Sequence, residues 1–112
     1  MKAGSQDAVR GKTLRFNWTD GPTKGATHEH VFHEDGTVEW HSAGAGAKPD
    51  GGGERVRFAD ERVADGVRLV SYLSKSGYTL TVALNFQSRS IVGVASNDSQ
   101  WMPVHGRLEV AK

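Results

Sequence analysis

The sequence contains no cysteine, which excludes disulfide bonds, thiol catalysis and cysteine-ligated zinc. It also lacks any apolar run long enough for a signal peptide or a membrane span, so we expect a cytoplasmic protein that does not contact membranes. Charges of both signs are interspersed and the formal net charge is only +1, which argues against nucleic acid as a partner. No segment keeps a helical hydrophobic period, and we expect at most a short N-terminal helix.

What the chain does contain is a series of segments in which apolar and polar residues alternate, separated by turn signals. The 112 residues suit a single domain over 1–112, and the 14 glycines favour many tight turns. Strongly β-prone segments are separated by turn signals such as Asp20-Gly21-Pro22, Asp35-Gly36 and Asp65-Gly66. We predict strands over 12–18, 26–33, 37–42, 54–64, 66–73, 78–86, 91–97 and 104–111.

Eight short strands joined in sequence by tight turns favour an all-β, antiparallel, up-and-down barrel, because closing the sheet removes its exposed edges. Such a barrel has an interior large enough for its own side chains or for one small ligand. Two segments stand outside this pattern. We expect 1–10 to be flexible, and the Gly/Ala-rich segment 43–53 to be a loop that is either a lid over the barrel or a plain connector.

The strings "GKTLRFNWTDGPTKGATHEHVFHEDGTVEW", "DGVRLVSYLSKSGYTLTVALNF" and "IVGVASND" resemble the MoaF-like family (molybdenum cofactor biosynthesis protein F-like) of the calycin superfamily. The resemblance runs from Gly11 to Val110. It implies an eight-stranded, lipocalin-like barrel with a central apolar cavity, assembled as a homodimer. It implies little about chemistry, because a shared fold does not transfer function.

More distantly, the chain resembles the phenolic acid decarboxylases. That family has tyrosines on its first strand, where this chain has Phe16 and Trp18. Its glutamate would follow the Ser71-Tyr72 pair by two residues, where this chain has Ser74. Its cavity arginine is approximated only by Arg55 or Arg57. These departures argue against decarboxylation, because little remains to deliver a proton or to grip a carboxylate.

Four of the five histidines fall within "THEHVFHEDGTVEWHS" at 27–42. His28 and His30 share one face of a predicted strand, about 7 Å apart. One interpretation is a metal site completed by Glu34 and by His41 or His105. A second is that the imidazoles face a cavity and hydrogen-bond a ligand, and a third is that they are ordinary polar residues of a strand. We predict no metal and no cofactor.

The large side chains expected to point inward are aromatic, and they either line an apolar pocket or simply fill the core. We predict a ligand site formed by Phe16, Trp18, His28, His30, Phe32, Val38, Trp40 and Tyr72. Charged residues on the strands, Arg57, Arg68, Glu29 and Glu39, are expected to face solvent. Trp101, in an expected loop, is predicted to cap one end of the barrel, with a dimer contact as the alternative.

The resulting hypothesis is a barrel that binds a small apolar or aromatic molecule at its centre. One alternative is an enzyme on the same barrel, an isomerase, cyclase or lyase with a cavity histidine as general acid or base. Another is a structural or interaction module with a filled barrel.

Overall fold

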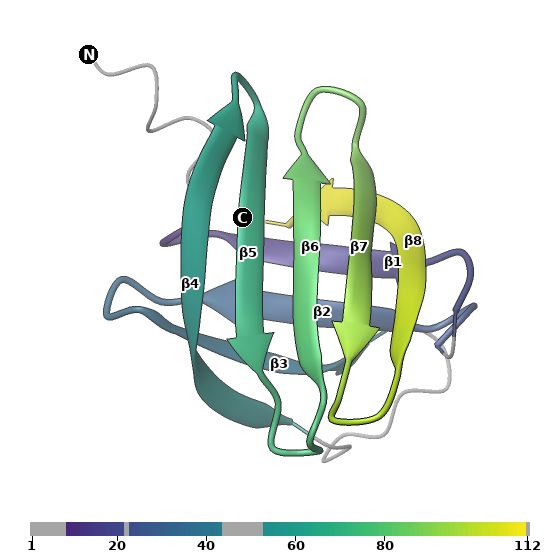
Figure 1. Cartoon of the computed structure of the whole chain (residues 1–112). Coiled ribbons are helices and arrows are strands. Elements are labelled where there is room, and N and C mark those ends of the chain that lie inside the picture. Colours follow the sequence, from purple (N-terminus) through teal and green to yellow (C-terminus); the bar gives the residue numbers. More distant parts are fainter. Residues whose placement is uncertain (1–8, 22, 44–52, 112) are drawn as a thin grey trace.

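The computed structural model describes residues 9–21, 23–43 and 53–111 of the chain. These residues form a closed, all-β barrel in which each strand is antiparallel to the next and the last strand pairs with the first (Figure 1). This confirms the predicted fold class. The described part of the chain contains no helix, and therefore none that could span a membrane.

The strands agree with the predicted ones to within one or two residues, except at the start of the last. They are β1 (Thr13–Trp18), β2 (Thr27–Phe32), β3 (Thr37–Ala43), β4 (Glu54–Ala64), β5 (Val67–Leu73), β6 (Thr79–Asn85), β7 (Ser90–Ser96) and β8 (Trp101–Val110).

Alternation places the large apolar side chains inside. In β1, Leu14, Phe16 and Trp18 are buried, whereas Arg15 between them is exposed. The register carries this face around the barrel, since Phe16 lies opposite His28 on one side and Leu108 on the other. The period-2 pattern is therefore what turns the sequence into an inner and an outer surface.

The β2–β3 turn shows how local chemistry fixes the register. Gly36 has φ 90°, a conformation that glycine adopts without a steric penalty. Asp35 Oδ1 accepts hydrogen bonds from Thr37 N at 3.0 Å and from Thr37 Oγ1 at 2.6 Å. The predicted Asp-Gly hairpin is confirmed, and it pairs Phe32 with Val38 on the inner face.

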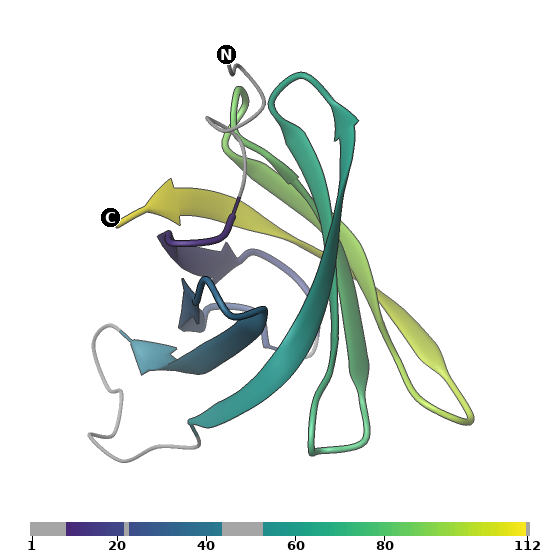
Figure 2. The ribbon, with the colours of Figure 1, turned by 90° about the vertical axis from the view of Figure 1, so that its left-hand side faces the viewer.

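The barrel turns a corner along β4, the longest strand. Its first four residues, Glu54–Arg57, pair with β3, and the residues from Phe58 onward pair with β5. Figures 1 and 2 show this teal strand curving from beside β3 toward the turn with β5, so that β5, β6 and β7 cross in front of β1, β2 and β3. A register shift between Arg62 and Ala64 marks a further bend.

One end of the interior is closed by the segment before β1. Val9 is fully buried, although it belongs to the segment expected to be flexible. Gly11 N donates to Phe32 O at 2.7 Å, and Phe32 N donates to Lys12 O at 2.9 Å, so this segment is bonded to the end of β2. Residues 1–8 and 44–52, which include most of the predicted flexible terminus and loop, lie outside the described residues.

The prediction that Arg68 faces solvent is wrong. Its side chain lies on the inner face with Val70 and Tyr72, at 16% exposure, and its Nη2 donates to Asp60 Oδ2 at 2.6 Å. A cation can point inward here because an inward carboxylate on the neighbouring strand neutralises it. Arg57, Glu29 and Glu39 lie on the outer face, as predicted.

The placement of Trp101 is also wrong. It begins β8 rather than lying in a loop, pairs with Ser96 of β7, and is 70% exposed on the outer face. It therefore does not cap the barrel. The strand extends further than predicted because Trp101, Met102 and Pro103 continue the ladder with β7.

Candidate functional site

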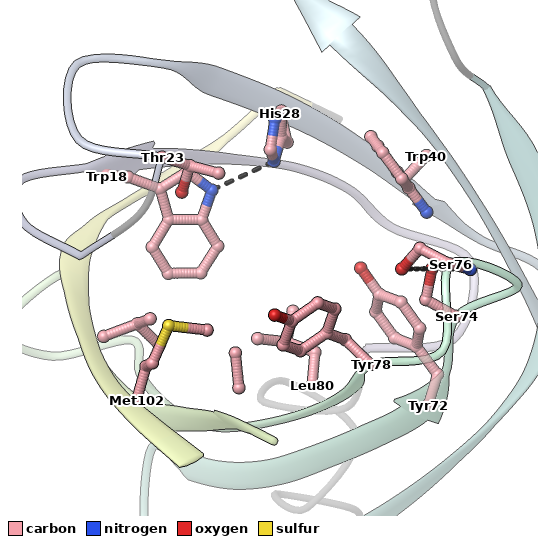
Figure 3. A pocket seen from close by; sticks show the side chains of 12 residues that line it. Trp18, Thr23, His28, Trp40, Tyr72, Ser74, Ser76, Tyr78, Leu80 and Met102 are labelled. Carbon is pink, nitrogen blue, oxygen red and sulfur yellow. Dashed lines mark hydrogen bonds between the residues drawn. The ribbon is translucent and has the colours of Figure 1, made fainter. Parts of the chain in front are cut away.

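A cavity of about 310 Å³ lies inside the barrel at the end where β1 connects to β2, β3 to β4, β5 to β6 and β7 to β8 (Figure 3). It collects side chains from segments far apart in the sequence because alternate connections of an up-and-down barrel meet at the same end. The lining residues are Trp18, Thr23, His28, Trp40, Tyr72, Ser74, Ser76, Tyr78, Leu80, Ala95, Met102 and Val104.

His28 is oriented in this cavity by a tryptophan. Trp18 Nε1 donates a hydrogen bond to His28 Nδ1 at 3.0 Å (Figure 3). Since an indole N–H can only donate, Nδ1 must carry the lone pair, and the neutral ring carries its proton on Nε2. Burial lowers the pKa of His28, which favours this neutral form. His28 therefore offers an N–H donor from a fixed ring.

His30, two residues further along β2, is sealed below the cavity. It is fully buried, and burial together with the neighbouring His28 lowers its pKa to about 3. Its Nε2 lies 2.9 Å from the Tyr72 hydroxyl, and its Nδ1 is buried without a hydrogen-bond partner. The ring of Phe16 stacks on it at 4.0 Å between centroids. This histidine is a neutral member of the core, and its hydrogen bond to Tyr72 connects it to the cavity lining.

The predicted ligand residues thus divide into two levels. Trp18, His28, Trp40 and Tyr72 line the cavity. The remaining four, which we call the core layer, are almost completely buried and do not line it: Phe16, His30, Phe32 and Val38. The core layer is tightly stacked, with the His30 and Phe32 rings 6.0 Å apart and nearly parallel, and it closes the cavity from below.

A carboxylate from β4 lies behind the cavity wall, where it is hydrogen-bonded to two lining residues. Glu54 lies on the inner face of β4, with Phe58 further along the same face. Its Oε2 accepts hydrogen bonds from Trp40 Nε1 at 2.8 Å and Ser74 Oγ at 2.6 Å, and its Oε1 accepts one from Lys75 N at 2.8 Å. Partial burial alone would raise the pKa of Glu54, but these donors hold it below its usual value. The group is therefore an ionised anchor for two lining residues.

Several site residues were missed from the sequence. Tyr78 and Leu80 share the inward parity of their strand, and Glu54 shares that of Phe58, so alternation could have identified them. Thr23, Ser74 and Ser76 lie in connections, where strand parity does not apply. Their positions depend on how the turns fold over the barrel end, for which the sequence gives no comparable signal.

The metal interpretation is not supported by the positions of its proposed ligands. His41 and His105 lie on the outer face, where they bind Glu29 Oε1 at 3.1 Å and Asp20 Oδ2 at 2.8 Å. Within the described ranges no group of three or more His, Cys, Asp or Glu side chains is placed to hold a metal ion.

Comparison with known proteins gives a likeness of fold. No family model matches the chain, and no curated protein matches its sequence. Among solved structures, one described as a "putative beta-lactamase" from Burkholderia vietnamiensis is similar, with a TM-score of 0.74 and 17% sequence identity. The match covers 92% of this chain and 95% of that one. At this identity it supports the barrel architecture alone.

Proposed function

We propose that the protein binds a small, largely apolar or aromatic molecule in the cavity at the end of its barrel. The cavity itself carries this proposal, since about 310 Å³ lies within the range of small-ligand sites. Its walls are mainly aromatic and aliphatic, with a few convergent polar groups such as His28 Nε2 and the Tyr72 hydroxyl. That composition suits a ligand held by apolar contact and oriented by a small number of hydrogen bonds.

Titration with the neutral fluorophore N-phenyl-1-naphthylamine tests this proposal, because its emission rises in apolar surroundings. We expect saturable binding to one site per chain. Ala95→Phe, which adds a ring to the cavity lining, should weaken binding at least about tenfold. Ala59→Phe, on the exposed face of β4, is the matched control and should bind like the unmodified protein. Unsaturable binding, or equal binding by both variants, would count against a cavity site.

An enzyme on the same barrel is the second candidate, and the fixed orientation of His28 favours it. A neutral imidazole in the cavity wall, with its proton on Nε2 and its ring held by Trp18, is suited to proton transfer in an isomerase, cyclase or lyase reaction. Turnover of a bound compound, lost in His28→Phe with binding retained, would distinguish catalysis from simple binding.

The distant resemblances add little to this assignment. Membership of the MoaF-like family remains a proposal, as does a cytoplasmic location. Ser74, which stands where the phenolic acid decarboxylases have a glutamate, holds Glu54 beside the cavity, but Arg55 and Arg57 both point outward. The β-lactamase description of the structural neighbour does not lead us to propose that reaction, since the Ser74 hydroxyl is committed to Glu54 and no lysine lines the cavity within the described residues.

We also propose that the chain forms a homodimer through the outside of β5–β8. Three rows of side chains cross this face, and among them only His105 is titratable: Leu69, Ala83, Val92 and His105; Ser71, Thr81, Val94 and Pro103; Leu73, Thr79, Ser96 and Trp101. Leu73 and Trp101 are 72% and 70% exposed. A second copy offers the same uncharged surface, so that an isologous contact brings no like charges together.

Sedimentation velocity tests the dimer. The unmodified protein should sediment as a dimer and Trp101→Lys as a monomer. Thr13→Lys, which places the same charge on the outside of β1, should remain dimeric. A monomeric unmodified protein would refute the proposed interface.

A further inference from the structure

The distribution of charge around the cavity indicates which sign of ligand charge it favours. Among the described lining residues there is no lysine or arginine, and the one histidine, His28, is held neutral by burial. The carboxylate of Glu54 is hydrogen-bonded directly to the lining residues Trp40 and Ser74. The cation that acts on this carboxylate, Lys75, helps to lower the pKa of Glu54 but is not among the lining residues, so an anionic ligand would meet no cationic side chain in the described lining.

The aromatic rings around the cavity also favour a ligand with a positive charge. Figure 3 shows Trp18, Trp40, Tyr72 and Tyr78 arranged around the open space, with His28 between the two indoles. The faces of indole and phenol rings carry negative electrostatic potential and attract cations, most strongly where water is partly excluded. Several such rings around one cavity are the arrangement with which proteins bind ammonium groups.

Glu54 places a full negative charge directly behind two of the lining residues, Trp40 and Ser74. Its negative charge, secondary to burial, contributes to raising the pKa of the Tyr72 hydroxyl, so the carboxylate acts across the cavity wall. Three donors fix its position: Trp40 Nε1, Ser74 Oγ and the backbone N–H of Lys75. A carboxylate held by neighbouring donors stays ionised and cannot swing away into solvent at low cost.

We propose that the ligand of this cavity carries a positive charge, as a primary amine or a quaternary ammonium group on an apolar or aromatic body. The inference rests on the proposed small-molecule site and specifies which molecules it selects. Trp18, Trp40, Tyr72 and Tyr78 surround the ammonium group, and Glu54 supplies the opposite charge.

Three probes of similar size and different charge test this. They are benzyltrimethylammonium, its neutral isostere neopentylbenzene, and the anion 3-phenylpropanoate, each titrated with quenching of the tryptophan emission as the signal. We expect the cation to bind most tightly and the anion most weakly. Glu54→Gln keeps an acceptor for Trp40 and Ser74 but removes the charge. It should weaken binding of the cation about three- to tenfold, as expected for charges about 6 Å apart at the water-like effective dielectric of about 40 to 80 of a half-open site, and leave binding of the neutral probe unchanged.

Two further variants separate charge from structure. Glu61→Gln makes the same change on the outer face of the same strand, where Glu61 is exposed, and should alter no affinity. Trp40→Leu removes one aromatic face and should weaken the cation more than the neutral probe. Binding of neopentylbenzene as tight as that of the cation, or an equal effect of Glu54→Gln on all three probes, would overturn the inference while leaving the binding site intact. Absence of binding by every probe at millimolar concentration would overturn the site itself and the inference with it.

Discussion

The buried imidazole of His30 should make the protein sensitive to acid in a way that one substitution removes. In the folded state its pKa falls to about 3, mainly because burial penalises the charged ring, whereas the ordinary value is 6.5. Between these two pH values the unfolded chain binds one more proton at this position than the folded chain does. The contribution of neutral His30 to stability is therefore complete above pH 6.5 and is lost as the pH falls toward 3.

The magnitude follows from the difference between the two pKa values. Each pH unit well inside that window costs about 1.4 kcal/mol, so that lowering the pH from 6.5 to 4.5 removes about 2–3 kcal/mol of unfolding free energy. Domains of this kind are stable by about 5–15 kcal/mol in total. His28, whose pKa is also lowered by burial, acts in the same direction. These two histidines alone should make the free energy of unfolding fall markedly as the pH is lowered.

The substitution that isolates the effect is His30→Phe, because phenylalanine fits the stack between Phe16 and Phe32 and cannot titrate. At pH 7.5 the variant should be less stable by about 1–3 kcal/mol, since the Tyr72 hydroxyl loses its partner. Between pH 6.5 and 4.5 it should lose about 2–3 kcal/mol less than the unmodified protein, so that the two stability curves converge or cross.

Urea unfolding at several pH values, followed by circular dichroism, measures both curves. Val82→Ala is the matched control, because it destabilises the core by about 2 kcal/mol without removing a titratable group. Its curve should lie below that of the unmodified protein and run parallel to it. If His30→Phe also runs parallel, then the imidazole is not the source of the acid sensitivity and the reasoning from its burial is refuted.

Three other substitutions test the interior by the same urea titration. Tyr72→Phe leaves His30 Nε2 without its partner and should cost about 1–3 kcal/mol; no change would show that this contact carries no net energy. Asp60→Asn leaves the inward guanidinium of Arg68 uncompensated and should cost about 3 kcal/mol, whereas a neutral result would mean that water reaches the cation. Gly93→Ala places a methyl group against the β6 backbone and should cost about 2 kcal/mol or more; unchanged stability would show that the two strands can separate there without penalty.

Much of the fold could be predicted because one simple rule, alternation, applies to every strand. Parity predicts that Phe16, Trp18 and Trp40 point inward, and the structure places them there; His28, whose orientation the sequence leaves open, points inward as well. Turn chemistry supplied the connections, as the Asp-Gly hairpin at 35–36 shows. Closure of the barrel followed from the need to pair the edge strands.

The errors arose where a residue's type suggested one environment and its partner created another. Arg68 was assigned to solvent because cations avoid the interior, yet Asp60 makes an inward position tolerable. Trp101 was expected in a loop that caps the barrel, yet pairing with β7 makes it the first residue of β8 and places it on the outer face. Both outcomes depend on a residue from another strand, and a pattern read along one strand does not contain that information.

The position of an inward residue along the barrel axis decides whether it lines the cavity. The alternation of side chains along a strand gives no information about that position. His28 and His30 occupy the same face of the same strand, but one lines the cavity and the other is fully buried below it. The difference arises from the neighbours: His30 is stacked by Phe16 and bonded to Tyr72, while His28 is bonded to Trp18 through Nδ1 and lines the cavity. A well-packed core layer resists deformation, so that it holds Tyr72 and the rings above it in place before any ligand arrives. For the ligand site proposed above, little conformational entropy then remains to be lost on binding, and small differences in ligand charge can decide affinity.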